Sequence, residues 1–167
     1  MHYLQGKAEH VRPGELLSLL QDLYGDRLRL VNGHQVSAGR IGQYEFNNTY
    51  QYVIAREETH LQWLAEAIVD LGGSVPAEAA PEPSVGSEHD IIARDLEGER
   101  AFVERWRARV ATLTNVRHRK MLELVLGESL EHARFFEEAV AGHKDLLGRS
   151  CTGAGQRGTV LATRWIE

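Results

Sequence analysis

The chain has 167 residues and a formal net charge of −5, with 43% hydrophobic and 26% charged residues, which is typical of a soluble protein with one domain and one core. This charge excludes the concentrated basic surface of a nucleic-acid-binding protein. The sequence also contains no run of about 18 apolar residues, so we expect neither a nucleic-acid partner nor a membrane.

The first predicted helix follows Pro13-Gly14 and continues to about residue 36. Its apolar residues recur mostly at spacings of three and four, which is the period of an amphipathic helix. They are Leu16, Leu20, Leu23, Tyr24, Leu30 and Val31. The preceding segment, MHYLQGKAEHVRPG, has no apolar stretch of signal-peptide length, so we expect a cytoplasmic protein.

The second predicted helix extends from about Asn48 to Leu71, and we expect Asn47 or Asn48 to be its N-cap. Gly72-Gly73 is a typical helix C-terminus. One face of this helix carries both apolar and polar residues. These are Tyr50, Val53, Glu57, His60, Leu64, Ile68 and Leu71.

Residues 74–87 contain three prolines and no apolar periodicity, which predicts a long crossover loop. The third helix is predicted over about Glu88 to Thr114, and Asn115 marks a turn. The fourth is predicted over about Val116 to Leu147. Together the four segments predict an all-α fold, an antiparallel four-helix bundle with a long crossover between the second and third helices.

The last residues change in character. We predict that residues 1–147 form the bundle and that residues 148–167 form an extended, non-helical C-terminal tail, glycine-rich at first and β-prone near its end. The single cysteine, Cys151, excludes an internal disulfide and any metal site built from paired cysteines.

Polar residues interrupt the apolar stripes of three predicted helices. Glu57 and His60 are three residues apart on one face, Glu99 lies three residues before Phe102, and Glu128 and His132 are four apart. Buried carboxylates without a partner would cost many kcal/mol. We therefore predict a metal ion among them. The candidate ligands are Glu57, His60, Glu99, Glu128 and His132, a combination of carboxylates and imidazoles that suits iron or manganese and, less exclusively, zinc.

Three segments carry a resemblance to a known family. The stretches EETHLQWLAEAIVDLGG, DLEGERAFVERW and LVLGESLEHARFF resemble the second, third and fourth helices of the ferritin-like superfamily, which includes bacterioferritin, rubrerythrin and carboxylate-bridged di-iron proteins. The resemblance covers about residues 14–145. It implies a glutamate on each of two helices and a Glu-x-x-His motif on each of the other two. It places Glu57, His60, Glu99 and His132 at ligand positions.

The ligand set departs from this pattern in two helices. Ser129 stands where a Glu-x-x-His motif ending at His132 needs a glutamate, although Glu128 is one residue away. In the first helix the glutamate position falls near Leu23, and the polar residues on the apolar stripe are instead Arg27 and His34.

Two interpretations of these first-helix residues are open. An inward Arg27 would pair with Glu57 or Glu128 and replace the charge of one metal ion, although an arginine that reaches to solvent is the simpler interpretation. We interpret His34 as satisfying a local hydrogen bond. The sequence is compatible with one metal, with an asymmetric pair of metals, or with an eroded site held by salt bridges.

The leading functional hypothesis is a ferritin-like metal-binding protein that combines iron, or alternatively manganese or zinc, with oxygen or peroxide redox chemistry. The alternative is a ferritin-like structural or interaction module with no metal chemistry. The tail shows no pattern for a fifth helix, which disfavours an iron-storage cage, and the lone cysteine disfavours a rubrerythrin-like electron path. A hydroxylase acting on an organic substrate stays open. We expect a homodimer, because such bundles often pair.

Overall fold

The computed structural model describes residues 13–77 and 80–147. These residues form four helices, and no strand occurs among them. The helices are α1 (Pro13–Ala38), α2 (Tyr44–Asp70), α3 (Glu88–Ala111) and α4 (Val116–Val140). The predicted C-terminal tail and Cys151 lie outside the described residues.

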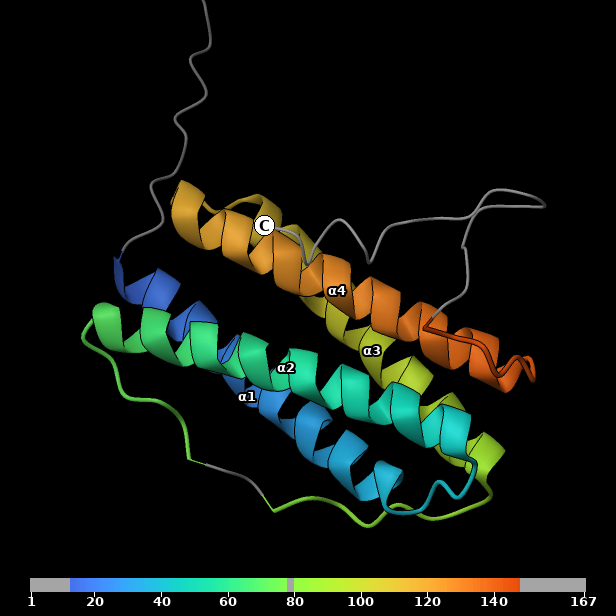
Figure 1. Cartoon of the computed structure of the whole chain (residues 1–167). Helices are drawn as coiled ribbons and strands as arrows, with labels where there is room; N and C mark the ends of the chain where they lie inside the picture. The colour runs from blue at the N-terminus through green and yellow to red at the C-terminus, as the bar shows by residue number, and fades with distance from the viewer. Residues whose placement is uncertain (1–12, 78–79, 148–167) are drawn as a thin grey trace, which may run out of the picture.

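The four helices form a bundle of two hairpins. Helix α1 packs against α2, and α3 packs against α4, while α1 also contacts α3 and α2 also contacts α4. The segment between α2 and α3 runs along the length of the bundle before α3 begins (Figure 1). This arrangement confirms the predicted all-α bundle with its long crossover. Within the described part of the chain, no helix combines the length and apolar character needed to cross a membrane.

The N-terminus of α2 differs from the prediction. The helix begins at Tyr44 after the N-cap Gln43, whose side chain makes no capping hydrogen bond, so the predicted asparagine cap is wrong. The Asn47 side chain instead donates to the carbonyl of Ala38, at 2.8 Å. Ala38 is the last residue of α1, so Asn47 connects the end of one helix to the start of the next and adds a second donor to a carbonyl that also accepts from the Ile41 amide at 3.3 Å.

The C-terminus of α2 agrees with the prediction. Gly72 has φ +77°, a left-handed conformation that suits glycine, and the Gly73 amide donates to the carbonyl of Ile68 at 2.9 Å. A Cβ atom on Gly73 would lie 2.4 Å from a methyl carbon of Leu17. Glycine therefore allows the turn to approach α1 closely.

Side-chain caps define the starts of α3 and α4. Ser87 and Asp90 form a capping box at α3, and Asn115 accepts from the amide of His118 at α4. Helix α4 ends at Val140, earlier than the predicted Leu147. A turn through Gly142, with φ +86°, ends it there.

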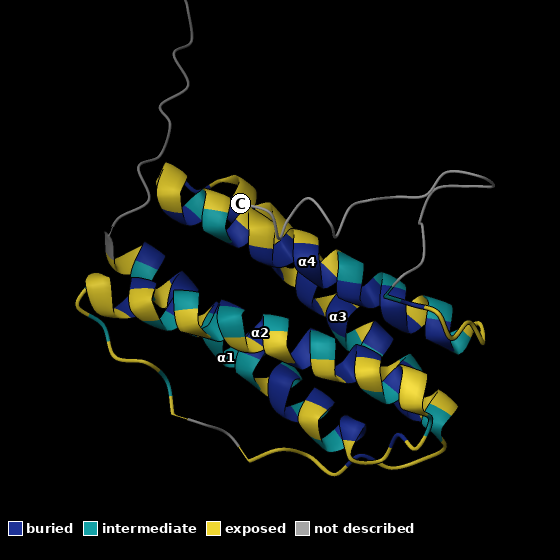
Figure 2. Ribbon diagram, in the orientation of Figure 1, coloured by how far each residue is buried: buried dark blue, intermediate teal, exposed yellow. Residues whose placement is uncertain are grey.

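The core contains two apolar clusters separated by a layer of buried polar residues. The first cluster includes Leu20, Leu64, Trp106 and Leu122. The second includes Tyr50, Ile91, Phe135 and Phe136. On every helix, the polar positions lie between residues of the first cluster and residues of the second. Buried residues gather on the inner faces of the helices (Figure 2). The residues that we call the polar layer are Arg27, His34, Glu57, His60, Glu99, Glu128, Ser129 and His132.

Candidate metal centre

The polar layer draws on all four helices, and none of its residues is more than 3% exposed. The sequence predicted that Glu57, His60, Glu99 and His132 would face inward, and all four are buried. Their origins are as follows: Arg27 and His34 from α1, Glu57 and His60 from α2, Glu99 from α3, and Glu128, Ser129 and His132 from α4.

Arg27 connects the four helices. Its Nη1 lies 2.7 Å from Oε1 of Glu57 and 3.0 Å from Oε1 of Glu99, and its Nη2 donates to the hydroxyl of Ser129. The guanidinium carbon lies 4.0 Å from the centre of the Phe102 ring, a distance typical of a cation–π contact. The interpretation of Arg27 as a side chain that reaches solvent is therefore wrong, because Arg27 is fully buried as a counter-ion.

His34 is held by the second carboxylate oxygen of Glu57. Its Nδ1 lies 2.8 Å from Oε2 of Glu57. Its Nε2 has no hydrogen-bond partner among the described residues and lies 4.0 Å from Oε1 of Glu99. His34 therefore directs an unpaired ring nitrogen toward the carboxylate of another helix.

Glu99 completes a group of three ligand-type side chains. Its Oε2 is buried and has no hydrogen-bond partner in the described structure. One ligand atom from each of His34, Glu57 and Glu99 can be chosen so that all lie within 4.8 Å of one another. The arrangement of three such groups at this separation is one that a single metal ion could bridge.

The remaining members of the polar layer form a second group beside the first. Nε2 of His60 lies 2.7 Å from Oε2 of Glu128, and Arg56 donates to both oxygens of Glu128 at 2.8–3.2 Å. The rings of His60 and His132 are stacked with centres 6.2 Å apart. His132 also places Nδ1 3.4 Å from Oε1 of Glu57, so it links the two groups.

Burial and pairing act in opposite directions on the titration of the central residues. Burial by itself lowers the pKa of His34, but the charge of Glu57 and the hydrogen bond to it raise that pKa to about 9. Burial raises the pKa of Glu57, and the positive charges of His34 and Arg27 outweigh this effect and hold it well below the ordinary value. Glu57 is therefore the ionised carboxylate of the centre.

Glu99 behaves differently although it contacts the same arginine. Burial raises its pKa to about 8, since the favourable charge of Arg27 is offset by the negative charge of Glu57. Burial also lowers the pKa of both His60 and His132. Neutral imidazole is the form that binds metals, and these two histidines favour it.

Two residues of this centre, Arg27 and His34, are not among the ligands predicted from the sequence. Both lie on the apolar stripe of α1 and are seven residues apart, which is about two helical turns. The signal available in the sequence was the presence of two ionisable residues at core positions of the same helix. What the sequence did not contain was the identity of the partners, since Glu57 and Glu99 belong to other helices.

The donor set can be compared with the ligands that a two-metal carboxylate centre requires. Such a centre uses a glutamate from each helix, whereas this chain has Arg27 on α1 and Ser129 on α4 at the heart of the layer. A complete two-metal set therefore does not fit. A single ion does fit the group of His34, Glu57 and Glu99, because the unpaired Nε2 and Oε2 atoms supply donors that nothing else in the described structure uses.

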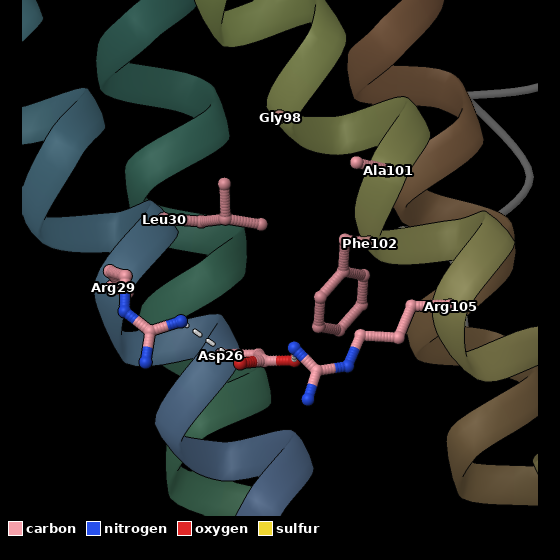
Figure 3. A pocket seen from close by; sticks show the side chains of 7 residues that line it. All are labelled: Asp26, Arg29, Leu30, Gly98, Ala101, Phe102 and Arg105. Atoms are coloured by element: carbon pink, nitrogen blue, oxygen red, sulfur yellow. Dashed lines mark hydrogen bonds and ion pairs between the residues drawn. The ribbon is translucent and has the colours of Figure 1, made fainter.

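A surface pocket between α1 and α3 approaches the centre. It has a volume of about 190 Å³ and a mainly apolar floor that includes Leu30, Gly98 and Phe102. Asp26 and the two arginines that it pairs with, Arg29 at 3.0 Å and Arg105 at 2.9 Å, lie at its edge (Figure 3). Phe102, which lines the pocket, also contacts the guanidinium of Arg27 in the polar layer.

Comparison with known proteins supports the fold. No family model matches the chain, and no curated protein matches it. Two solved structures are similar to it, each with a TM-score of 0.67. One is a conserved hypothetical protein from Mycobacterium tuberculosis, with 17% identity over 73% of this chain and 94% of that one. The other is described as a ferritin-like, diiron-carboxylate protein from Bacillus anthracis str. Ames, with 16% identity over 77% of this chain and 96% of that one.

The chain therefore has the ferritin-like four-helix bundle fold, as the resemblance implied. Within the described residues, its buried His34–Glu57–Glu99 cluster is a group that could hold a metal ion.

Proposed function

We propose that this protein binds one iron or manganese ion at His34, Glu57 and Glu99, and that the bound ion reacts with dioxygen or peroxide. The observation that carries the proposal is the convergence of three buried ligand-type side chains from α1, α2 and α3 within 4.8 Å. Two carboxylates with one imidazole form a donor set that suits these metals. Of the ligands predicted from the sequence, Glu57 and Glu99 belong to this proposed set, and His34 joins them.

The protein residues would prepare the site in three ways. Glu57 fixes the orientation of the His34 ring through Nδ1, which leaves Nε2 directed toward Glu99. Arg27 holds one oxygen of each carboxylate. Metal ligation at Nε2 requires His34 to lose the proton that its raised pKa favours, so binding is coupled to proton release.

The neighbouring groups would supply shielding and access. Burial of the whole layer excludes bulk water, and iron bound there would supply electrons to dioxygen or peroxide. The pocket between α1 and α3 offers small molecules an approach to within one aromatic ring of the centre. His60 and His132, with Glu128 and Arg56 behind them, flank the proposed site from α2 and α4.

One structural neighbour agrees with this proposal. The Bacillus anthracis protein is described as a diiron-carboxylate protein, and it shares the fold along most of its length. This likeness supports metal binding by a bundle of this fold, while the position, the ligands and the number of ions proposed for this chain come from its own side chains.

Metal analysis of the purified protein tests the proposal. Protein prepared without chelator and loaded anaerobically with iron or with manganese is expected to hold about one ion per chain, and His34→Ala to hold far less. His118→Ala is the matched control, because His118 is also a buried histidine with one ring nitrogen unpaired in the described structure but lies outside the polar layer. Substoichiometric metal in the unmodified protein, or equal metal in His34→Ala and His118→Ala, would contradict the proposal.

A second candidate function follows from Arg27. The guanidinium already supplies positive charge to Glu57 and Glu99, so the bundle can hold its polar layer together as a structural or interaction module. In that case chelators leave the melting temperature unchanged. A bound metal instead raises it in proportion to the logarithm of the free metal concentration above the dissociation constant.

A further inference from the structure

We propose that Arg27, held by Ser129, permanently occupies the position that a second metal ion takes in a two-metal carboxylate centre. The proposal rests on the proposed function for the first ion. In this proposal the centre holds only one metal ion, because the guanidinium of Arg27 takes the place of the other. It also predicts that two substitutions convert the site to a two-metal site.

The contacts of Arg27 are those expected of a central cation. One nitrogen, Nη1, lies 2.7 Å from a Glu57 oxygen and 3.0 Å from a Glu99 oxygen, so it bridges carboxylates from two helices. The other terminal nitrogen, Nη2, donates to the hydroxyl of Ser129 on α4. A bridging position between carboxylates of different helices is where a metal ion would otherwise balance their charge.

The hydrogen bonds of the Ser129 hydroxyl agree with this arrangement. Its hydroxyl donates to the carbonyl of Val125 at 2.9 Å, so its oxygen lone pairs are free to accept from Arg27. A glutamate at this position would stand three residues before His132, the spacing that Glu57 has to His60. Ser129 thus replaces one carboxylate of the metal-binding pattern and pairs with Arg27, which lies about one helical turn beyond the predicted glutamate position near Leu23.

The charge of Arg27 makes the exclusion permanent. Guanidinium does not lose its proton in proteins, so a divalent ion at this position would meet a full positive charge at every accessible pH. Arg27 is also fully buried, with its guanidinium carbon 4.0 Å from the centre of the Phe102 ring of α3.

Equilibrium dialysis with manganese chloride tests the inference. The double variant Arg27→Glu/Ser129→Glu is expected to bind one more Mn²⁺ per chain than the unmodified protein. Arg105→Glu/Ser74→Glu is the matched control, because it makes the same change in net charge at exposed positions outside the layer. It is expected to gain no ion. Equal numbers of bound ions in a folded Arg27→Glu/Ser129→Glu variant and in the unmodified protein would overturn the inference.

A second variant keeps the test decisive if the double variant does not fold. Arg27→Met removes the charge and adds no ligand, and it is expected to bind Mn²⁺ about tenfold more tightly than the unmodified protein, with a larger rise in melting temperature on addition of the metal. Arg105→Met is its control. Equal or weaker Mn²⁺ affinity in Arg27→Met would overturn the inference.

These measurements separate the two proposals. The proposed function depends on the number of ions that the unmodified protein binds, whereas the inference depends on the change caused by substitution at positions 27 and 129. A chain that binds no Mn²⁺ with or without Arg27 would refute the proposed function, whereas a chain that binds one Mn²⁺ and gains none on substitution would overturn the inference alone.

Discussion

The first apolar cluster and the polar layer are equally buried but are stabilised in opposite ways. Leu64 and Trp106 in the cluster, like Arg27 and Glu57 in the layer, have no exposed surface. Each fully buried apolar side chain contributes about 1.5–3 kcal/mol to folding. In the layer, the cost of removing charges from water nearly cancels their attraction. The contribution to stability therefore explains why the apolar cluster is present. The presence of the polar layer must instead be explained by a chemical function or by a role in specifying one fold.

Removal of Arg27 should have the largest effect. Arg27→Met leaves Glu57 and Glu99 buried without their cation, so the free energy of unfolding without added metal is expected to fall by about 3–5 kcal/mol in urea titrations. Arg100→Met is the control, since the pairs of Arg100 with Glu97 and Glu137 are exposed, and it should change by less than about 0.5 kcal/mol. A loss below about 1 kcal/mol for Arg27→Met would show that the layer is not a network of coupled charges.

Replacing the group as a whole sharpens the same comparison. The quadruple variant Arg27→Met/His34→Leu/Glu57→Leu/Glu99→Leu makes the layer resemble the apolar cluster, and it should recover most of the stability that Arg27→Met loses. Urea titration of both variants under the same conditions measures the recovery. Losses that simply add would indicate that shape, rather than charge balance, dominates in the layer.

The apolar cluster should respond to truncation without dependence on charge. Leu64→Ala is expected to reduce the free energy of unfolding by about 2–5 kcal/mol, because it removes a fully buried side chain and leaves a cavity. The loss should be the same at low and high salt. Leu124→Ala, at a position that is 44% exposed, should change stability by less than about 0.5 kcal/mol. A salt-dependent loss at Leu64 would contradict the separation of the two regions.

The smallest of these effects should be a pH dependence at the edge of the layer. Burial raises the pKa of Glu128, but hydrogen bonds from His60 and Arg56 outweigh this and lower it to about 2. A lowered carboxylate pKa stabilises the fold fully above the unfolded value of about 4.5, and this contribution disappears as the pH falls toward 2. With allowance for solvent around Arg56, it is about 1–2 kcal/mol.

Glu128→Gln tests this sign. The variant should lose this stability at pH 7 and show a flatter decline than the unmodified protein between about pH 5 and pH 2, measured by thermal unfolding in a pH series. Glu123→Gln, on the exposed side of α4, is the control and should retain the original pH profile. Parallel acid profiles for Glu128→Gln and the unmodified protein would refute the assignment.

The sequence predicted which positions face the core more reliably than which side chains meet there. The spacing on each helix placed Glu57, His60 and Glu99 inward, and all are buried. Arg27 was on the stripe as well, but its partners lie 30, 72 and 102 residues away in the chain. Helical periodicity shows which face of a helix is buried but contains no information about contacts between helices. The partners of Arg27 could therefore be identified only from the three-dimensional structure.

The same limit explains the start of α2. An asparagine before an apolar stripe is a good N-cap by local rules, and the sequence therefore placed the cap at Asn47 or Asn48. In the structure the helix continues back to Tyr44, and Asn47 binds the carbonyl of Ala38 at the end of α1. A contact between two helix ends replaced the local one. The turn at Gly72 was predictable because its signal is local, a positive φ that favours glycine.

The polar layer also fixes how the two hairpins are aligned along the bundle axis. Arg27, His34 and Glu57 satisfy one another within the first hairpin, whereas Glu99 and Ser129 come from the second. Sliding one hairpin past the other by one helical turn, about 5.4 Å, would separate Arg27 from Glu99 and Ser129 and leave it only its pair with Glu57. Leucines alone tolerate such a slip, since one apolar layer resembles the next. The contacts of Arg27 with Glu99 and Ser129 therefore favour one alignment of the two hairpins, whereas purely apolar surfaces would permit several.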